Sequence, residues 1–240
     1  MSAKKQVKQS KSSDKKFKTP NAGRRLKNLS HSLSWALRHA APQLGLTMTP
    51  DGFVPVQEIL QCNHSKFKAG YSNSDIVEVV RTNVKKRFTI AVKPASDYYD
   101  DKDGHIECIR ANQGHTIKSV DPDQLLTRLS PEELAAFPTI VHGTYFGAWD
   151  AIKKCGYLSR MNRQHIHFAV GLLGEDGVIS GMRKSCEVYV YIDPVKCAND
   201  NIIFYRSDNG VLLTAAKDGK LELTYLKKAT DKNGNTLYVR

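Results

Sequence analysis

Arginine and histidine cluster in one short segment of this chain. Arg163, His165 and His167 lie within five residues, and the two-residue period of a strand would place both histidines on one face. A His-x-His pair is half of a zinc site, but no third ligand presents itself nearby, so we expect no metal. The remaining chemistry open to such a cluster is the binding of an anion by fixed cations.

Other polar motifs lie at the ends of expected elements. Arg38 and His39 end an expected helix. The motif His142-Gly143-Thr144 lies where a strand leads into a helix, and free N–H groups at a helix start favour a phosphate. Each motif alone also has an ordinary interpretation as surface, cap or turn. Two more motifs adjoin expected strands: Lys85-Lys86-Arg87 and Gln113-Gly114-His115.

The elements that must position these residues follow from apolar spacing. Three short helices are predicted, of which the first stops before Pro42, the second starts at Pro55 and the third is capped by Ser74. Residues 88–92 and 105–110 then read as the strands of a hairpin. Three helices followed by a β-hairpin is the order of a winged helix, a common nucleic-acid-binding unit.

The second half is predicted to be rich in strands, so the fold class is α+β. Residues 116–138 form a connector, in which Ser130 and Glu133 make a capping box for a short helix. A helix with Tyr145, Ala148, Trp149 and Ile152 on one face ends at Gly156. The expected strands are 139–141, 164–170, 186–192, 202–205, 211–214 and 236–239, and Leu221, Leu223 and Tyr225 alternate with polar neighbours as a strand does.

The charge of the 240-residue chain is concentrated at its start. The net charge is +12, and residues 1–28 carry ten Lys or Arg and one Asp, a net charge of +9. That segment lacks apolar periodicity and is predicted to be a disordered basic arm. It is either a non-specific grip on nucleic acid, a nuclear targeting signal or a solubilising tail.

Composition excludes several classes of protein. No apolar run approaches the roughly 18–20 residues that span a bilayer, and the polar start lacks the apolar core of a signal peptide. The five cysteines are odd in number and scattered, which favours reduced thiols over a disulfide frame. We therefore expect an intracellular monomer, cytoplasmic, nuclear or both, with no membrane partner.

The motifs taken together resemble the KptA/Tpt-type RNA 2′-phosphotransferases. The similarity runs in order from about Leu29 to Thr214. It rests on 33–39 (LSWALRH), 87–90 (RFTI), 113–115 (QGH), 142–144 (HGT), 163–167 (RQHIH) and 179–183 (ISGMR).

The resemblance implies a winged-helix RNA lobe over residues 29–115 and an ADP-ribosyltransferase-like lobe over 139–240 that holds NAD⁺. It implies transfer of the splice-junction 2′-phosphate of ligated tRNA to NAD⁺. The products are 2′-hydroxyl RNA, nicotinamide and ADP-ribose 1″,2″-cyclic phosphate. NAD⁺ is then a co-substrate, no metal takes part, and the partner is 2′-phosphorylated tRNA.

The resemblance also implies a role for each matching residue. The catalytic set around the phosphate is Arg38, His39, Arg87 and Arg163. The residues that hold NAD⁺ are His142, Gly143, Thr144, His167 and Arg183. Gln113 and His115 bind the RNA or its phosphate.

Three other functions stay open. The same lobe could ADP-ribosylate nucleic-acid phosphates or proteins, although no Glu lies within residues 163–170 to activate a protein acceptor. A 2H-type phosphoesterase needs two H-x-[ST] motifs, and only residues 142–144 qualify. A non-catalytic RNA-binding winged helix would not need Arg163.

Overall fold

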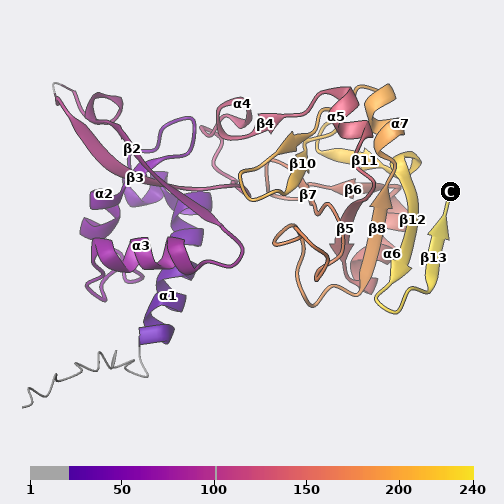
Figure 1. The fold of residues 1–240 in the computed structure, drawn as a ribbon, viewed down its shortest axis with the longest axis horizontal. Helices are drawn as coiled ribbons and strands as arrows, with labels where there is room; N and C mark the ends of the chain where they lie inside the picture. Colours follow the sequence, from indigo (N-terminus) through magenta and orange to yellow (C-terminus); the bar gives the residue numbers. More distant parts are fainter. Residues whose placement is uncertain (1–21, 101) are drawn as a thin grey trace, which may run out of the picture.

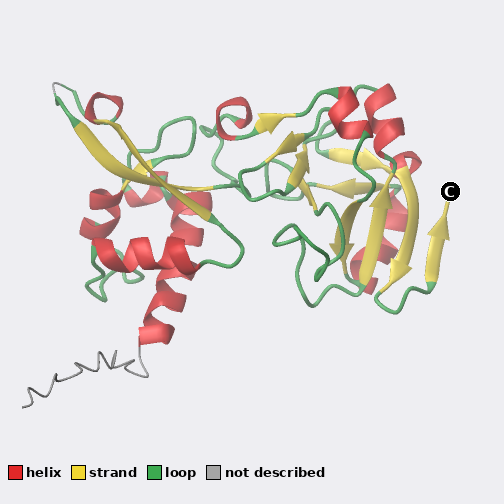
Figure 2. Ribbon diagram, in the orientation of Figure 1, coloured by secondary structure: helices red, strands yellow, loops and turns green. Residues whose placement is uncertain are grey.

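The computed structural model describes residues 22–100 and 102–240. In that part of the chain, helices combine with several antiparallel sheets, so the expected mixture of α and β structure is confirmed. Figure 1 shows the first half of the chain at one end of the molecule and the second half at the other. Figure 2 shows that the second half is mainly strands with a few short helices.

The first half combines helices α1 to α3 with a sheet of strand order β1-β3-β2. Strands β2 and β3 pair antiparallel from Phe88 opposite Ala111 to Pro94 opposite His105, which confirms the predicted hairpin. The bounds are α1 Ala22–Trp35, α2 Val56–Gln61, α3 Asn73–Thr82, β1 Val54–Pro55, β2 Phe88–Pro94 and β3 His105–Ala111, with 3₁₀ turns at Pro42–Leu44 and Ala95–Asp97.

Helix α1 begins earlier than the leucine spacing indicates. It starts at Ala22, inside the segment predicted to be a disordered arm, so that prediction is wrong for residues 22–28. Arg25 anchors this turn, since its guanidinium donates to the carbonyls of Ala69 and Gly70 and lies 2.9 Å from the Asp75 carboxylate. The rest of the predicted arm, residues 1–21, lies outside the described residues.

The end of the first helix is not regular. After Trp35 the chain makes a π-helical turn, Ala36–Ala40, which no apolar spacing predicted. Single π turns inside helices are rare and are often found at functional sites. This one carries Arg38 and His39.

The cap of α3 is Ser72, so the assignment of Ser74 was wrong by two residues. The Ser72 hydroxyl accepts from the N–H of Asp75, and the Asp75 carboxylate accepts from the N–H of Ser72. An acidic residue three positions after the cap completes a capping box, and Asp75 has that spacing from Ser72.

The second half contains one four-stranded sheet of order β4-β9-β10-β7 and another of order β13-β12-β8-β5, beside the pair β11-β6. Its helices are α4 Pro122–Leu125, α5 Pro131–Ala135, α6 Phe146–Cys155 and α7 Pro194–Asn199. Its strands are β4 Thr127–Arg128, β5 Ile140–Thr144, β6 Tyr157–Ser159, β7 Ile166–Phe168, β8 Val188–Ile192, β9 Tyr205–Arg206, β10 Leu212–Thr214, β11 Lys220–Glu222, β12 Leu226–Asp231 and β13 Thr236–Val239, with a 3₁₀ turn at Leu223–Tyr225.

Several predictions for this half are confirmed. Ser130 and Glu133 form the capping box of α5, and Gly156 ends α6 in the left-handed region at φ 84°. Ala148 is exposed, however, so the buried face of α6 centres on Trp149. The sequence patterns missed α4, β4, β6, β12 and α7, and the alternation of Leu221, Leu223 and Tyr225 forms a strand only as far as Glu222.

The two largest hydrophobic clusters among the described residues meet at strand β10. The first joins α1, α2, α3 and the first sheet, and it also takes in Val211 and Leu213. The second packs around Trp149, Phe168 and Phe204 and includes Leu212. Because neighbouring strand residues face opposite ways, β10 contributes to both clusters.

Candidate active site

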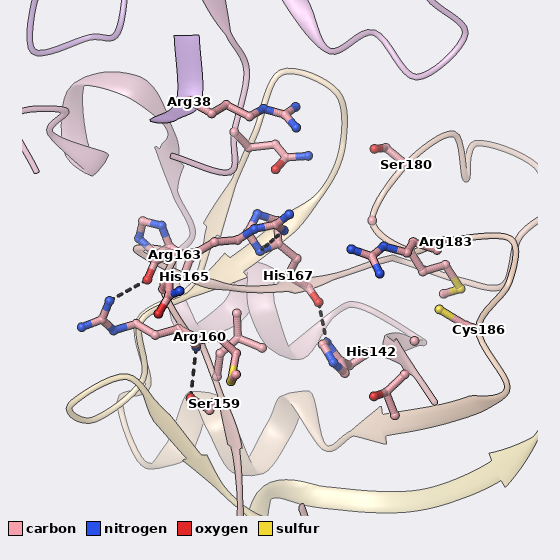
Figure 3. Close-up of a pocket in the computed structure, with 18 of the residues that line it drawn as sticks. Arg38, His142, Ser159, Arg160, Arg163, His165, His167, Ser180, Arg183 and Cys186 are labelled. Carbon is pink, nitrogen blue, oxygen red and sulfur yellow. Dashed lines mark hydrogen bonds between the residues drawn. The ribbon is translucent and has the colours of Figure 1, made fainter. Parts of the chain in front are cut away.

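A cavity of about 650 Å³ lies between the two halves of the molecule. Among the residues that the structure describes, six Lys or Arg and four His line it, with no Asp or Glu. Figure 3 shows several of these side chains around the cavity. The cations are Arg38, Lys85, Arg87, Arg160, Arg163 and Arg183, and the histidines are His39, His142, His165 and His167.

The π-helical turn presents His39 to the cavity with a defined ring orientation. The Thr116 hydroxyl donates to the carbonyl of Arg38 at 3.3 Å, and its oxygen lies 3.0 Å from Nδ1 of His39. A hydroxyl carries one proton, so its oxygen accepts from Nδ1–H, which leaves Nε2 as the free base. Burial, then Arg38 and Arg163, lowers the pKa of His39, so the ring is neutral at pH 7.

The Arg38 guanidinium is buried without a counter-ion. Its Nε and Nη2 atoms have no hydrogen-bond partner among the described residues, and it packs against Gly114, which has φ 91°. Burial, then the nearby charges of Arg163 and Arg87, lowers the pKa of Arg38 to about 10. Unpaired donors in a cavity rich in cations are suited to an anionic ligand.

Arg87 enters the cavity from a tight loop before β2. The Asn83 side-chain oxygen accepts from the N–H of Arg87 at 3.1 Å and from its Nη1 at 3.3 Å. Lys86 has φ 42°, and its carbonyl accepts from Asn112 Nδ2 at 2.9 Å. Burial lowers the pKa of Arg87, as expected for a cation with no acid beside it.

His142 and His167 form a chain that ends in the cavity. His142 Nδ1 donates to the main-chain oxygen of His167 at 2.9 Å, so its Nε2 is a free acceptor (Figure 3). His167 Nδ1 lies 3.5 Å from Arg163 Nη1, and its Nε2 is buried without a partner among the described residues. His167 Nδ1 accepts from the Arg163 guanidinium, so the ring proton is on Nε2. Burial holds the pKa of both rings low.

Gly143 and Thr144 form a wall of the cavity at the end of β5. A Cβ at Gly143 would lie 2.8 Å from Cys186 Sγ and 2.9 Å from Met182 Cβ, so a larger residue does not fit. Arg183 follows Met182 in the chain, also lines the cavity and is exposed. A Tyr145 hydrogen bond raises the pKa of Arg183, so it stays charged.

The structure brings all but one of the predicted site residues to this cavity. They are Arg38, His39, Arg87, Gln113, His142, Gly143, Thr144, Arg163, His167 and Arg183. His115 does not reach it: the residue is 2% exposed, and neither ring nitrogen has a partner among the described residues. Burial lowers the pKa of His115 to about 3, so it is a neutral ring behind Arg38.

Sequence reasoning assigned no role to several other lining residues. Lys85 and His165 belonged to motifs that were noticed, whereas Arg160 belonged to none. Arg160 Nη1 donates to the carbonyl of Arg163 at 2.6 Å, which fixes the loop before β7. Ser180 was part of a matching motif. It is buried, and in Figure 3 it lies on the other side of the cavity from Arg160. A basic residue shortly before the Arg-x-His-x-His motif was the available signal for Arg160.

Within residues 22–100 and 102–240, no group of three or more His, Cys, Asp or Glu is placed to hold a metal ion. The helices there are all too short or too polar to cross a membrane.

The fold and the cavity together define a mixed α/β protein with a cation-lined cavity between its halves, a lining suited to an anionic ligand. The sequence profile described as "RNA 2'-phosphotransferase, Tpt1 / KptA family" matches residues 24–216. The chain belongs to this family, so the resemblance carried by the motifs is confirmed.

Similar proteins cover most of the chain. It is 46% identical over 186 residues to tRNA 2'-phosphotransferase 1 of Danio rerio, an alignment that covers 78% of this chain and 76% of the relative. It is 44% identical over 202 residues to tRNA 2'-phosphotransferase 1 of Homo sapiens, covering 84% and 74%. It is 35% identical over 195 residues to tRNA 2'-phosphotransferase of Saccharomyces cerevisiae, covering 78% of each.

Proposed function

We propose that this chain removes the splice-junction 2′-phosphate of ligated tRNA by transferring it to NAD⁺. The observation that carries the proposal is the cavity with six cations and no Asp or Glu among its described lining residues. A 2′-phosphate and a pyrophosphate together require several cations, and an anionic phosphate needs no carboxylate base to become a nucleophile. The names of the similar proteins, all tRNA 2′-phosphotransferases, support tRNA as the substrate.

The two halves have separate tasks in this proposal. Residues 29–115 form a winged-helix RNA lobe, residues 116–138 a connector, and residues 139–240 an ADP-ribosyltransferase-like lobe for NAD⁺. The order of α1, α2, α3 and the β2–β3 hairpin supports the first assignment. The antiparallel sheets that carry His142 and His167 support the second.

The residues present fit a dinucleotide. His142 Nε2 is an acceptor suited to a ribose hydroxyl, and His167 Nε2–H is a buried donor without a partner in the described structure. Gly143 lets this wall of the cavity pack closely against Met182 and Cys186, where a Cβ would clash. Arg183 supplies an exposed cation for the pyrophosphate, beside Thr144. When bound, NAD⁺ supplies the electrophilic anomeric carbon and the nicotinamide leaving group.

Positioning dominates the first step. A 2′-phosphate oxygen forms a bond to the anomeric carbon of the nicotinamide ribose, and nicotinamide departs with the electron pair of the broken C–N bond. Arg38, Arg87 and Arg163 hold the phosphate by charge-assisted hydrogen bonds, with Gln113 beside them. The unpartnered donors of Arg38 are available for this contact.

Proton transfer and charge stabilisation dominate the second step. The ribose 2″-hydroxyl attacks the phosphorus and the bond to the RNA 2′-oxygen breaks, which gives a cyclic phosphate and a 2′-hydroxyl. His39 Nε2 takes the proton of the attacking hydroxyl, and the protonated ring then returns it to the departing 2′-oxygen. The three arginines stabilise the charge that builds on the phosphoryl oxygens.

The test is an NAD⁺-dependent assay with an RNA that carries an internal 2′-phosphate. We expect release of ADP-ribose 1″,2″-cyclic phosphate and of nicotinamide. Arg163→Ala should abolish the reaction, and His39→Ala should stall it after nicotinamide release. Unchanged RNA from a folded preparation that binds NAD⁺ would refute the proposal, and activity without NAD⁺ would favour a phosphoesterase. Undiminished function in Arg163→Ala would favour a non-catalytic RNA-binding protein.

A further inference from the structure

The loop Asn83–Arg87 carries two of the cavity cations, yet it belongs to neither a helix nor a strand. The Lys85 ammonium donates to the carbonyl of Met182 at 3.1 Å, across the cavity from its own half. Lys86 is a non-glycine residue with φ 42°, a backbone conformation that neighbouring contacts must maintain. The placement of Arg87 therefore depends on what holds this loop.

One of the holding contacts comes from the second half of the chain. Asn209 is 3% exposed, and its Nδ2 donates to the carbonyl of Lys85 at 2.9 Å, 124 residues away in sequence. The Ser207 hydroxyl donates to Asn209 Oδ1 at 2.8 Å, which fixes the orientation of the amide. The Ser207 hydroxyl in turn accepts from the N–H of Val211. The side chain of Asn209 is therefore held within a hydrogen-bonded turn that runs from Ser207 to Val211.

This turn also contacts the first half through charge. Asp208 lies 2.8 Å from the Arg110 guanidinium, although its side chain is 47% exposed. An ion pair with a half-exposed carboxylate contributes little to stability because solvent screens it. Losing the buried hydrogen bond from the Asn209 amide, by contrast, leaves an unpaired polar group inside the protein, which costs more free energy. Asn209 is therefore the stronger fixed point of the two.

The turn is continuous with the sheet that carries His167. It joins β9 to β10, and Leu213 of β10 lies directly opposite His167 of β7 in the antiparallel register. One end of this sheet therefore presents His167 to the cavity, and the turn grips the loop that presents Arg87. The distance between the two ligand-binding elements is set through Asn209.

We propose that Asn209 is a positioning residue that fixes the loop Asn83–Arg87, and with it Arg87, relative to the sheet that carries His167. Its part in turnover rests on the proposed function, because the phosphate on Arg87 must meet the dinucleotide beside His167. The residue touches no reacting atom. It acts through the Lys85 carbonyl.

The test compares Asn209→Ala with Asn235→Ala in the full chain. Asn235 is a matched control, since its Nδ2 also donates at 2.8 Å within a turn, to Asp231, but outside the cavity. In Asn209→Ala we expect kcat to fall about 10- to 100-fold, with the KM for NAD⁺ within about twofold of wild type. Asn235→Ala should match wild type. An unchanged kcat in a folded Asn209→Ala, or an equal rise in the KM for NAD⁺, would overturn the proposal.

A double-mutant cycle with Arg87→Lys separates positioning from general damage. If Asn209 acts through Arg87, the loss caused by Asn209→Ala should shrink to about two- to threefold in the Arg87→Lys background. Equal losses in both backgrounds would overturn the inference. Ser207→Ala is a second variant, because it frees the amide without removing it, and it should lower kcat in the same direction.

Hydrogen exchange tests the positioning without any turnover. In Asn209→Ala, amides of the loop Asn83–Arg87 should exchange at least about 10-fold faster than in wild type, and in Asn235→Ala they should not change. This readout stays valid if the wild-type protein fails to process 2′-phosphorylated RNA, so it distinguishes a wrong function from a wrong role for Asn209. Unchanged exchange in the loop would refute the role directly.

Discussion

Thr116 Oγ1 lies 3.0 Å from Nδ1 of His39 and within hydrogen-bond distance of the carbonyl of Arg38. One hydroxyl from outside the helix thus holds both the ring and the π-helical turn that bears it. The arrangement makes Nε2 the basic atom of His39 at the cavity, which is the state that proton transfer requires.

Removing this hydroxyl should slow the reaction without unfolding the protein. Thr116→Val keeps the side-chain shape but frees the His39 ring, so kcat should fall about 10- to 100-fold. Thr82→Val is the matched control, since the Thr82 hydroxyl also donates to a carbonyl, that of Glu78, on helix α3. Steady-state kinetics and thermal melting check both variants. An unchanged kcat in Thr116→Val would contradict this role.

Adding a methyl group at Gly143 should close the dinucleotide site. The new Cβ would meet Cys186 Sγ at 2.8 Å and Met182 Cβ at 2.9 Å, so Gly143→Ala should weaken NAD⁺ binding at least about 10-fold. Gly147→Ala is the control, because no described atom lies within 4 Å of a Cβ there. Titration calorimetry with NAD⁺ measures both. Equal affinities for the two variants would count against the assignment of this wall.

Arg38→Met should abolish activity and preserve or raise stability. The guanidinium is buried, lacks a counter-ion in the described structure and is repelled by Arg163 and Arg87. Its removal should raise the free energy of unfolding by up to about 1–2 kcal/mol. Arg110→Met is the contrast, since it removes a hydrogen bond to the Asp51 carbonyl and the contact of the guanidinium with the Phe53 ring, and it should destabilise. Urea unfolding measures both, and equal destabilisation would contradict the prediction.

Acid should destabilise the fold through its buried histidines. Burial, then the charge of Arg38, lowers the pKa of His115 to about 3, and burial, then Arg160, lowers that of His165 to about 4. Below the ordinary value of roughly 6.5 the unfolded chain takes up protons that the folded chain refuses. The free energy of unfolding should therefore fall as pH falls from about 6.5 to about 4, by up to about 1.4 kcal/mol per pH unit for each ring.

The slope of stability against pH is the measurement. Urea unfolding at several pH values should give a shallower slope for His115→Gln than for wild type. His31→Gln, which replaces an exposed histidine, is the comparison variant. A slope that does not change in His115→Gln would show that its ring has the same pKa in the folded and the unfolded chain, which would contradict the prediction.

The sequence predicted the order of elements because local rules govern them. The alternation in β2, the capping box at Ser130 and the stop at Gly156 depend on near neighbours alone. The start of α1 was missed because Arg25 is held by contacts some 44 to 50 residues away. The π-helical turn was missed because it differs from a regular helix only in its hydrogen-bond register, which apolar spacing does not record.

Residues of the candidate site that belong to a recognisable motif were predicted from the sequence. The sequence was a poor guide where burial in the folded protein determines whether a residue reaches the cavity. His115 follows a turn as a surface residue would, but tertiary packing leaves it only 2% exposed. Arg160 and Asn209 stand in no motif. Their positions depend on loop closure and on contacts between halves of the chain, such as that of Asn209 with Lys85, which are visible only when the chain is folded.

Strand β10 has a consequence for the order in which the protein can mature. Leu212 packs into one hydrophobic cluster and Leu213 into the other, so a chain growing from the ribosome lacks part of its first cluster until residue 213 has emerged. The first half is therefore completed only after most of the second half has been made. A chain that ends before Val211 lacks the residues that finish its first hydrophobic cluster.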